Sequence, residues 1–160
     1  MDLGVRIRRD VALGSYPFTD IFQGFDGVAA VRAIFGKQTK DVLGETKVVV
    51  ASRRGYMHID DKTGDLHVSL PYLESADERY LYLDVIHELV HIRQFREGKE
   101  LFDEKYEYVD RPTEIEAYRA ALKEARRIGY EGKELVEYLK VDWVSEDDFK
   151  RFLDILGVER

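Results

Sequence analysis

Residues Val85 to Phe95 have the sequence V-I-H-E-L-V-H-I-R-Q-F, which contains the pattern H-E-x-x-H at His87, Glu88 and His91. Histidines four positions apart on an α-helix lie about one turn apart on the same face, so both imidazoles can bind one metal ion. Glu88 is rotated by about 100° from His87, which places it beside the ion and suits a base that deprotonates a metal-activated water. The pattern therefore predicts two zinc ligands and a catalytic base.

The alternative is a chance occurrence of two histidines and a glutamate in a helix, without a metal. The chain has only four histidines, and two of them belong to this pattern. Apolar residues surround almost the whole helix, which predicts that it is buried. Buried imidazoles are unfavourable unless their nitrogens are satisfied, and a metal ion satisfies them. We therefore favour a metal site. Asp84 is one candidate hydrogen-bond acceptor behind the ligands, but we favour its interpretation as a solvated charge one turn away.

The ends of this helix carry recognisable signals. Ser75 and Glu78 fit a capping box, and Gly98 follows the last apolar residue, so we expect a helix from about Ala76 to Glu97. Upstream, β-branched and apolar runs predict short strands at 47–51, 56–59 and 66–70.

The last two of these strands should form a hairpin with a turn at 61–64. His58 and His67 would then be cross-strand neighbours. No third ligand with matching spacing accompanies them, so we interpret them as an ordinary polar pair rather than as a second metal site.

Three further helices are expected downstream. Pro112 opens the first, in which Thr113 and Glu116 fit a capping box, and Gly129 ends it. A short helix near 133–139 and a last one at 146–156, capped by Ser145, follow.

A catalytic zinc needs a third protein ligand and one open position. Glu114 and Glu116 lie on this downstream helix about 200° apart, so only one of them can face the metal. Glu114 shares its side with a row of alanines that would let the two helices approach closely, whereas Glu116 lies among charged residues. We favour Glu114 and keep Glu116 as the alternative; acidic residues of the preceding loop come next, namely Asp103, Glu104 and Glu107.

This arrangement resembles the gluzincin zinc metallopeptidases, in which a glutamate on a later helix completes H-E-x-x-H and a small residue follows three positions on. Here these residues are Glu114 and Ala117. The short spacing and the sequence E-I-E-A are similar to those of the ImmA/IrrE-type peptidases, in which a strand before the motif helix borders the substrate cleft. The resemblance covers roughly residues 66–122 and implies that the strand at 66–70 offers an open edge to an extended peptide.

The chain also departs from that family. Tyr118 stands where the family usually has asparagine, and no DNA-binding segment is recognisable. The glycine and histidine that follow the motif in metzincins are missing as well. An oxyanion donor is still required, and Tyr106, Tyr108 and Tyr118 are the candidates.

Composition sets the remaining expectations. The 160 residues, 44% of them hydrophobic, predict a single domain, 1–160, of the α+β class. We expect a small antiparallel or mixed sheet packed on the buried motif helix and on a second helix that carries the third ligand, followed by C-terminal helices. The net charge of −7 argues against nucleic acid and anionic membranes as partners, and the sequence shows neither a signal peptide nor a membrane span. We therefore expect a cytoplasmic protein.

Two further features of the composition are informative. The absence of cysteine excludes disulfides and thiolate zinc sites. The lack of asparagine and the 36% of charged residues are typical of thermophile proteins.

The leading hypothesis is a zinc metallopeptidase with His87, His91 and Glu114 on the metal and Glu88 as general base, acting on a peptide or protein substrate. The second hypothesis is a metal-binding regulatory or interaction module without peptidase activity. An intact base at Glu88 favours the peptidase, because a structural zinc site needs no base and prefers four protein ligands.

Overall fold

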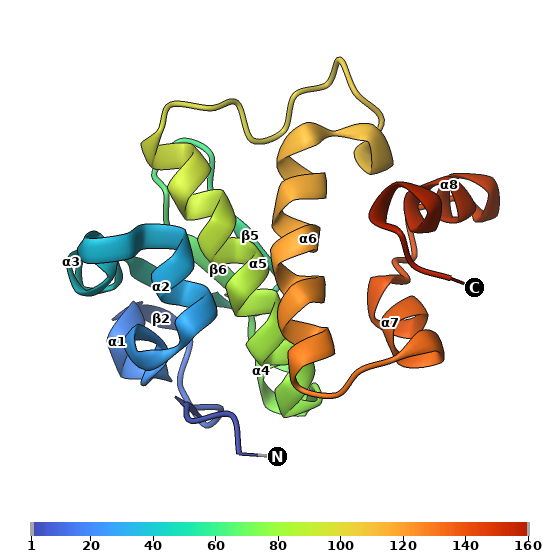
Figure 1. Cartoon of the computed structure of the whole chain (residues 1–160). Coiled ribbons are helices and arrows are strands. Elements are labelled where there is room, and N and C mark those ends of the chain that lie inside the picture. The colour runs from blue at the N-terminus through green and yellow to red at the C-terminus, as the bar shows by residue number, and fades with distance from the viewer. Residues whose placement is uncertain (1, 160) are drawn as a thin grey trace.

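Helix α5 (Glu78–Arg96) runs through the middle of the protein, with a mixed sheet on one side and helix α6 (Pro112–Arg127) beside it (Figure 1). The computed structural model describes residues 2–159. Apolar side chains on several sides of α5 are fully buried, as the near-continuous apolar sequence predicts. The helix that carries the H-E-x-x-H pattern is thus held rigidly in the core.

The main sheet has four strands in the order β2-β4-β6-β5. Their bounds are β2 (Gly14–Pro17), β4 (Lys47–Ala51), β5 (Met57–Ile59) and β6 (Leu66–Ser69). Strands β4 and β6 are parallel, and the other pairs are antiparallel. Strand β5 is therefore at an edge, whereas β6 has a neighbour on each side. The prediction that the strand at 66–70 has an open edge is wrong, because β4 and β5 pair with its two edges. The position of a strand within a sheet depends on segments that are distant in the sequence.

The β5–β6 hairpin is fixed against the end of α5. It pairs His58 with His67, as the turn at 61–64 predicts. Gly64 has a φ of 78°, and a Cβ atom placed there would lie 2.6 Å from the ring of Phe95. Only glycine allows this close approach and this backbone conformation together.

The N-terminal third covers the other side of α5 with short elements. A small sheet pairs β1 with β3, and three helices follow closely on one another. The bounds are β1 (Arg6–Ile7), α1 (Phe18–Ile21), β3 (Phe22–Gln23), α2 (Ala29–Phe35) and α3 (Thr39–Glu45). Phe18, Phe22 and Phe25 pack on one another here, and Phe25 also packs on Tyr82 of α5.

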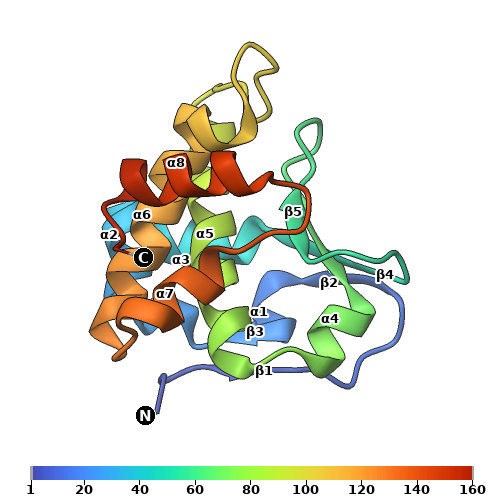
Figure 2. The same ribbon diagram turned by 90° about the vertical axis from the view of Figure 1, so that its right-hand side faces the viewer.

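The C-terminal helices α7 (Gly132–Leu139) and α8 (Glu146–Leu156) lie on the side of α6 opposite α2 (Figures 1 and 2). The Ser145 side chain accepts a hydrogen bond from the amide of Asp148 at 3.2 Å, so the predicted cap of α8 is confirmed. Their connection, residues 140–145, passes the sheet end near β5 (Figure 2).

Neither of the two predicted capping boxes forms, although α6 begins at Pro112 as predicted. Residues Leu70–Ser75 form a separate helix, α4, and the Ser75 hydroxyl donates to the carbonyl of Pro71. Asp77 caps α5 instead, since its carboxylate accepts from the amide of Arg79 at 2.8 Å. An aspartate two positions after a serine is an equally good cap by type, so the sequence alone did not distinguish them.

At the start of α6, the Thr113 hydroxyl likewise donates to the carbonyl of Leu101 and forms no capping box.

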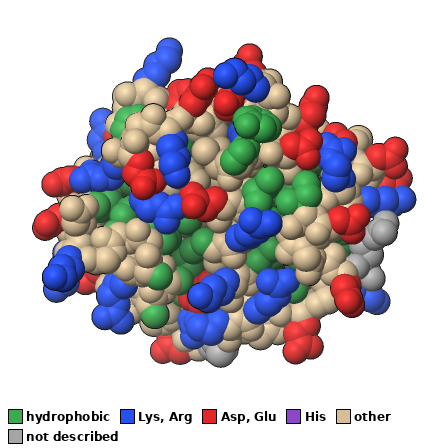
Figure 3. All heavy atoms as spheres, turned by 45° about the horizontal axis from the view of Figure 1, so that its top comes forward, with side chains coloured by type: hydrophobic (Ala, Val, Ile, Leu, Met, Phe, Trp, Pro, Cys, Tyr) green, Lys and Arg blue, Asp and Glu red, His purple; other side chains and the backbone are tan. Residues whose placement is uncertain are grey.

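The α+β class and the mixed sheet against the motif helix are confirmed. Among residues 2–159, none of the helices combines the length and the apolar character that a membrane crossing requires. Acidic and basic side chains are mixed over the face shown in Figure 3, with small apolar areas between them.

Candidate metal centre

The side chains of His87, His91 and Glu114 meet between α5 and α6. Oε1 of Glu114 lies 3.1 Å from Nε2 of His87 and 2.7 Å from Nε2 of His91. All three residues are buried, with exposed fractions of 7%, 2% and 5%. The two histidines come from successive turns of α5, and the alanine side of α6, with Ala117 and Ala121 fully buried, allows the close helix contact.

Hydrogen bonding sets the tautomer of His91. The amide nitrogen of Gln94 donates to the carbonyl of Thr113 at 3.1 Å and to Glu116 at 2.7 Å, so the amide oxygen of Gln94 is an acceptor. This oxygen lies 2.7 Å from Nδ1 of His91, which must therefore carry a proton. Nε2 of His91 then faces the carboxylate oxygen of Glu114. This contact is favourable only when Nε2 carries a proton or binds a metal ion.

The pKa values describe the protein with a proton in that position. Burial alone would lower the pKa of His91, but the hydrogen bond to Glu114 and the charge of Glu88 outweigh burial and raise the pKa to about 9. Burial would raise the pKa of Glu114, but the hydrogen bonds from the two histidines lower it well below its usual value. Burial lowers the pKa of His87. Without metal, the centre is a buried ion pair of His91 and Glu114 beside a neutral His87.

The donor set fits a zinc ion. Ligand atoms about 2.05 Å from a tetrahedral ion lie about 3.3 Å from one another. The contact of 3.1 Å from Glu114 to His87 is close to this value, and the contact of 2.7 Å to His91 needs to lengthen by about half an ångström. Two neutral imidazoles and a carboxylate are ligands of the type found in catalytic zinc sites.

Glu88 is the second carboxylate at this centre. The ligand atoms of His87, Glu88 and His91 lie within 4.8 Å of one another, which makes this a group that could hold a metal ion. Glu114 is not in that group, although its Oε1 lies 3.1 Å from Nε2 of His87 and 2.7 Å from Nε2 of His91, so both carboxylates lie beside the two histidines. Burial raises the pKa of Glu88 well above its usual value.

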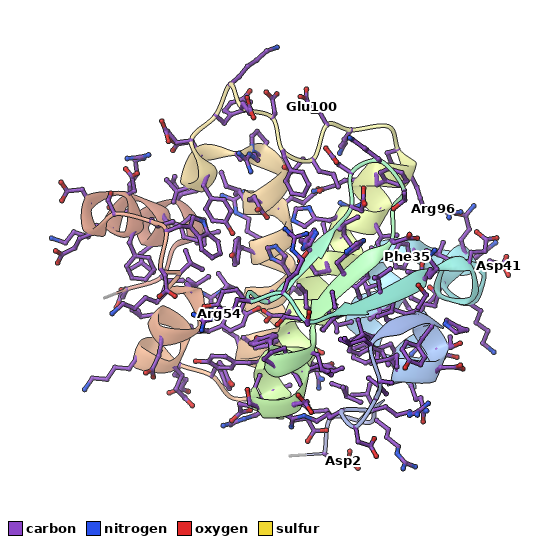
Figure 4. All side chains as sticks on the ribbon, turned by 180° about the vertical axis from the view of Figure 1, so that it is seen from behind. Asp2, Phe35, Asp41, Arg54, Arg96 and Glu100 are labelled. Atoms are coloured by element: carbon purple, nitrogen blue, oxygen red, sulfur yellow. The ribbon has the colours of Figure 1, made fainter. Side chains whose placement is uncertain are left out.

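A cavity of about 380 Å³ opens onto these residues. His87, Glu88, His91 and Glu114 line it together with aromatic side chains from the residue before β5, from α4 and α7, and from the α7–α8 connection. Figure 4 shows the sheet lying across α5 on this side, with Arg54 at the sheet end nearest the C-terminal helices.

Glu116, the alternative third ligand, is exposed and turned away from the cavity. Its carboxylate accepts from Arg93 at 2.6 Å and from Gln94 at 2.7 Å. The predicted orientation of α6, with Glu114 turned toward α5 and Glu116 turned toward solvent, is therefore correct. The loop acids Asp103, Glu104 and Glu107 do not line the cavity in the part of the chain that is described.

Asp84 is neither an acceptor for His87 nor a fully solvated charge. Its two carboxylate oxygens accept from the hydroxyls of Tyr72 and Tyr138, the latter at 2.8 Å. Nδ1 of His87 is buried and has no hydrogen-bond partner within residues 2–159. The ring of Tyr118 packs edge-on against His87 with centroids 4.2 Å apart, so packing rather than a hydrogen bond orients this imidazole.

Two of the three candidate oxyanion donors reach the cavity. The hydroxyls of Tyr108 and Tyr118 lie 2.7 Å apart, and both residues line the cavity. Tyr106 is 43% exposed and lies outside the lining.

His58 and His67 do lie side by side, with ring centroids 5.0 Å apart. Within the described residues they belong to no group of three potential metal ligands.

Sequence reasoning missed Gln94, Tyr72 and Tyr138. Gln94 could have been found, because it lies three positions after His91 on the same side of the helix. The two tyrosines lie 12 and 54 positions from Asp84, and nothing in the local sequence indicates these contacts.

Comparison of the chain with models of known protein families, with curated proteins and with solved structures finds no match.

Proposed function

We propose that this protein is a zinc-dependent peptidase, similar to the gluzincins of the ImmA/IrrE type, with His87, His91 and Glu114 as metal ligands and Glu88 as general base. The observation that carries the proposal is the convergence of both histidines on one oxygen of Glu114, with Glu88 beside them in an open cavity. A zinc ion bound there would lower the pKa of a water molecule and polarise a peptide carbonyl.

Glu88 takes the proton of the attacking water and passes it to the departing amine. Burial raises the pKa of Glu88 well above its usual value, which supports this role because it makes the carboxylate a stronger proton acceptor. Its place next to His87 in the sequence gives it a fixed position beside the ligands but rotated away from them.

The paired tyrosines are suited to stabilise the oxyanion. One hydroxyl of the Tyr108–Tyr118 pair donates to the other, and the second hydroxyl then has its proton free for a ligand. Burial raises the pKa of both tyrosines, so both remain protonated donors at neutral pH.

Strand β5 is the place for an extended substrate. The backbone N–H of Ser69 donates to the carbonyl of Tyr56, and that of Asp60 donates to the carbonyl of Asp65. The hydrogen-bonded pairs of this antiparallel ladder are therefore 56 with 69, 58 with 67 and 60 with 65. The N–H and C=O groups of Met57 and Ile59 therefore point to the open edge. Because Met57 also lines the cavity, a peptide added along β5 would pass the metal centre.

The test uses purified wild type and Glu88→Gln, each measured for zinc content and for cleavage of a broad peptide library. We expect one bound zinc in both proteins and cleavage by wild type alone, with the rate of the variant reduced by about 10²- to 10⁴-fold. Equal cleavage by the variant would remove Glu88 from the mechanism.

The second candidate is a metal-binding regulatory module without peptidase activity. One observation favours it, because Glu88 lies close enough to the histidines to act as a fourth ligand and close the site. Cobalt substitution separates the two candidates. A Glu88→Gln change that alters the visible spectrum of bound cobalt indicates a closed four-ligand site, whereas an unchanged spectrum supports an open catalytic one.

A further inference from the structure

Asp84 lies in the same cavity as the metal centre and has a separate position on its wall. It precedes His87 by three residues on α5, so it lies about one turn away on nearly the same side of the helix. Its carboxylate lines the cavity and is only partly buried. The proposed hydrolysis uses no group at this position.

Two tyrosines hold this carboxylate in place. The hydroxyl of Tyr72, on α4, donates to one oxygen, and the hydroxyl of Tyr138, on α7, donates to the other at 2.8 Å. A carboxylate has about four acceptor positions, so about two remain for a ligand. Burial raises the pKa of Asp84 to about 6, and the group is therefore largely ionised at neutral pH.

Aromatic rings extend this wall toward the cavity mouth. The ring of Tyr56 packs edge-on against Tyr72 at 5.0 Å, and that of Tyr80 packs edge-on against Tyr138 at 5.3 Å. Trp143 lies 6.2 Å from Tyr56. All these rings line the cavity. Ring faces carry partial negative charge and attract cations.

The surrounding charges permit a cation to bind here. Glu137 and Lys140 lie on the lining near Tyr138 and are both exposed, and Arg111 lines the cavity from the start of α6. The negative charge of Glu114 partly offsets the formal charge of a divalent ion at the metal centre, which reduces the repulsion of a positive group.

The ligand chemistry follows from the partly buried carboxylate. An apolar side chain placed against Asp84 would remove water from an ionised group and offer no compensation, and an acidic one would be repelled. A guanidinium or ammonium group offers both charge and hydrogen-bond donors.

We propose that Asp84, Tyr56, Tyr72, Tyr80, Tyr138 and Trp143, which we call the Asp84 pocket, bind a lysine or arginine side chain of the peptide substrate. The inference rests on the proposed peptidase function for its substrate, but the pocket itself can be tested without catalysis. Trp143 is the only tryptophan of the chain and is 57% exposed, so its fluorescence reports on ligand binding at this wall.

The experiment titrates the full-length protein, with and without chelator, with Nα-acetylarginine amide and with the neutral isostere Nα-acetylcitrulline amide. We expect about tenfold tighter binding of the arginine compound in wild type. Asp84→Asn should bring the two affinities within about twofold of each other. Asp147→Asn, which removes the same charge from an exposed residue of α8 outside the cavity lining, should keep the tenfold preference.

Equal affinity of wild type for the two compounds would overturn the proposal. If Asp84→Asn does not fold, as judged by circular dichroism, Tyr56→Leu at the exposed end of the pocket replaces it and should reduce the preference at least about threefold. A protein that prefers arginine but cleaves no peptide retains the Asp84 pocket and loses the peptidase function. A protein that cleaves peptides but does not prefer arginine retains the peptidase function and overturns the Asp84 pocket.

Discussion

Glu116 accepts a hydrogen bond from the side-chain amide of Gln94 at 2.7 Å, although Glu116 is exposed and contacts none of the three proposed ligands. This contact and that to the Thr113 carbonyl orient Gln94 so that its oxygen accepts from His91. Gln94 is therefore a positioning residue for the metal centre, because the proton on Nδ1 leaves the lone pair of Nε2 for the ion.

Gln94→Leu should weaken zinc binding by about 10- to 100-fold, since residues that orient metal ligands typically contribute this much. Zinc affinity measured by competition with a chromophoric chelator checks the result. Glu116→Gln is the matched control, because its amide oxygen still accepts from Gln94, and the affinity should change less than about threefold. A large loss in the control and none in Gln94→Leu would contradict this arrangement.

Glu114→Gln should reduce zinc affinity by about a hundredfold or more, because a neutral amide replaces a charged ligand. Circular dichroism should show an unchanged helix content, since the alanine side of α6 is unaltered. Full retention of zinc by this variant would mean that Glu88 supplies the carboxylate ligand.

Zinc affinity should rise with pH. The pKa of His91 in the metal-free protein is about 9, above its ordinary value, so zinc must displace one proton at neutral pH. The affinity should therefore increase about tenfold per pH unit from 7 toward 9 and then level off. Calorimetry in two buffers with different ionisation enthalpies should detect close to one proton released at pH 7.5.

The same proton affects the stability of the metal-free protein. Because the folded pKa of His91 is raised, its stabilising contribution is complete below the unfolded pKa of about 6.5 and is lost as pH rises through 9. Urea unfolding at pH 6.5 and pH 9.5 should show this loss in wild type, and a smaller one in Glu114→Gln. Equal losses in both proteins would show that another group is responsible.

Met57→Pro tests the place of the substrate backbone. Proline removes an N–H group that points to the open edge of β5, so the sheet should tolerate it while KM rises by about tenfold and kcat changes little. His58→Pro removes an N–H group from the ladder with β6 instead and should lower the melting temperature. If KM in Met57→Pro is unchanged, peptides do not bind along this edge.

The sequence was most informative where contacts are local. The apolar surroundings of α5, the spacing of His87 and His91 and the phase that separates Glu114 from Glu116 all depend on helix geometry within a few turns. The edge strand could not be predicted, because parallel pairing of β4 with β6 joins segments across the intervening β5. The Asp84 contacts were missed for the same reason, since Tyr72 and Tyr138 come from two other helices.

The contact between Gly64 and Phe95 determines which part of the cavity wall can move. The glycine leaves no space between the hairpin and the end of α5, so the edge strand and the metal-binding helix are expected to move as one rigid body. The loop of residues 140–145, whose Trp143 is largely exposed, also borders the cavity. Entry of a bulky protein segment is therefore expected to displace this loop and leave the distance between β5 and the histidines unchanged. A peptide aligned on the strand would then keep its register with the proposed catalytic groups.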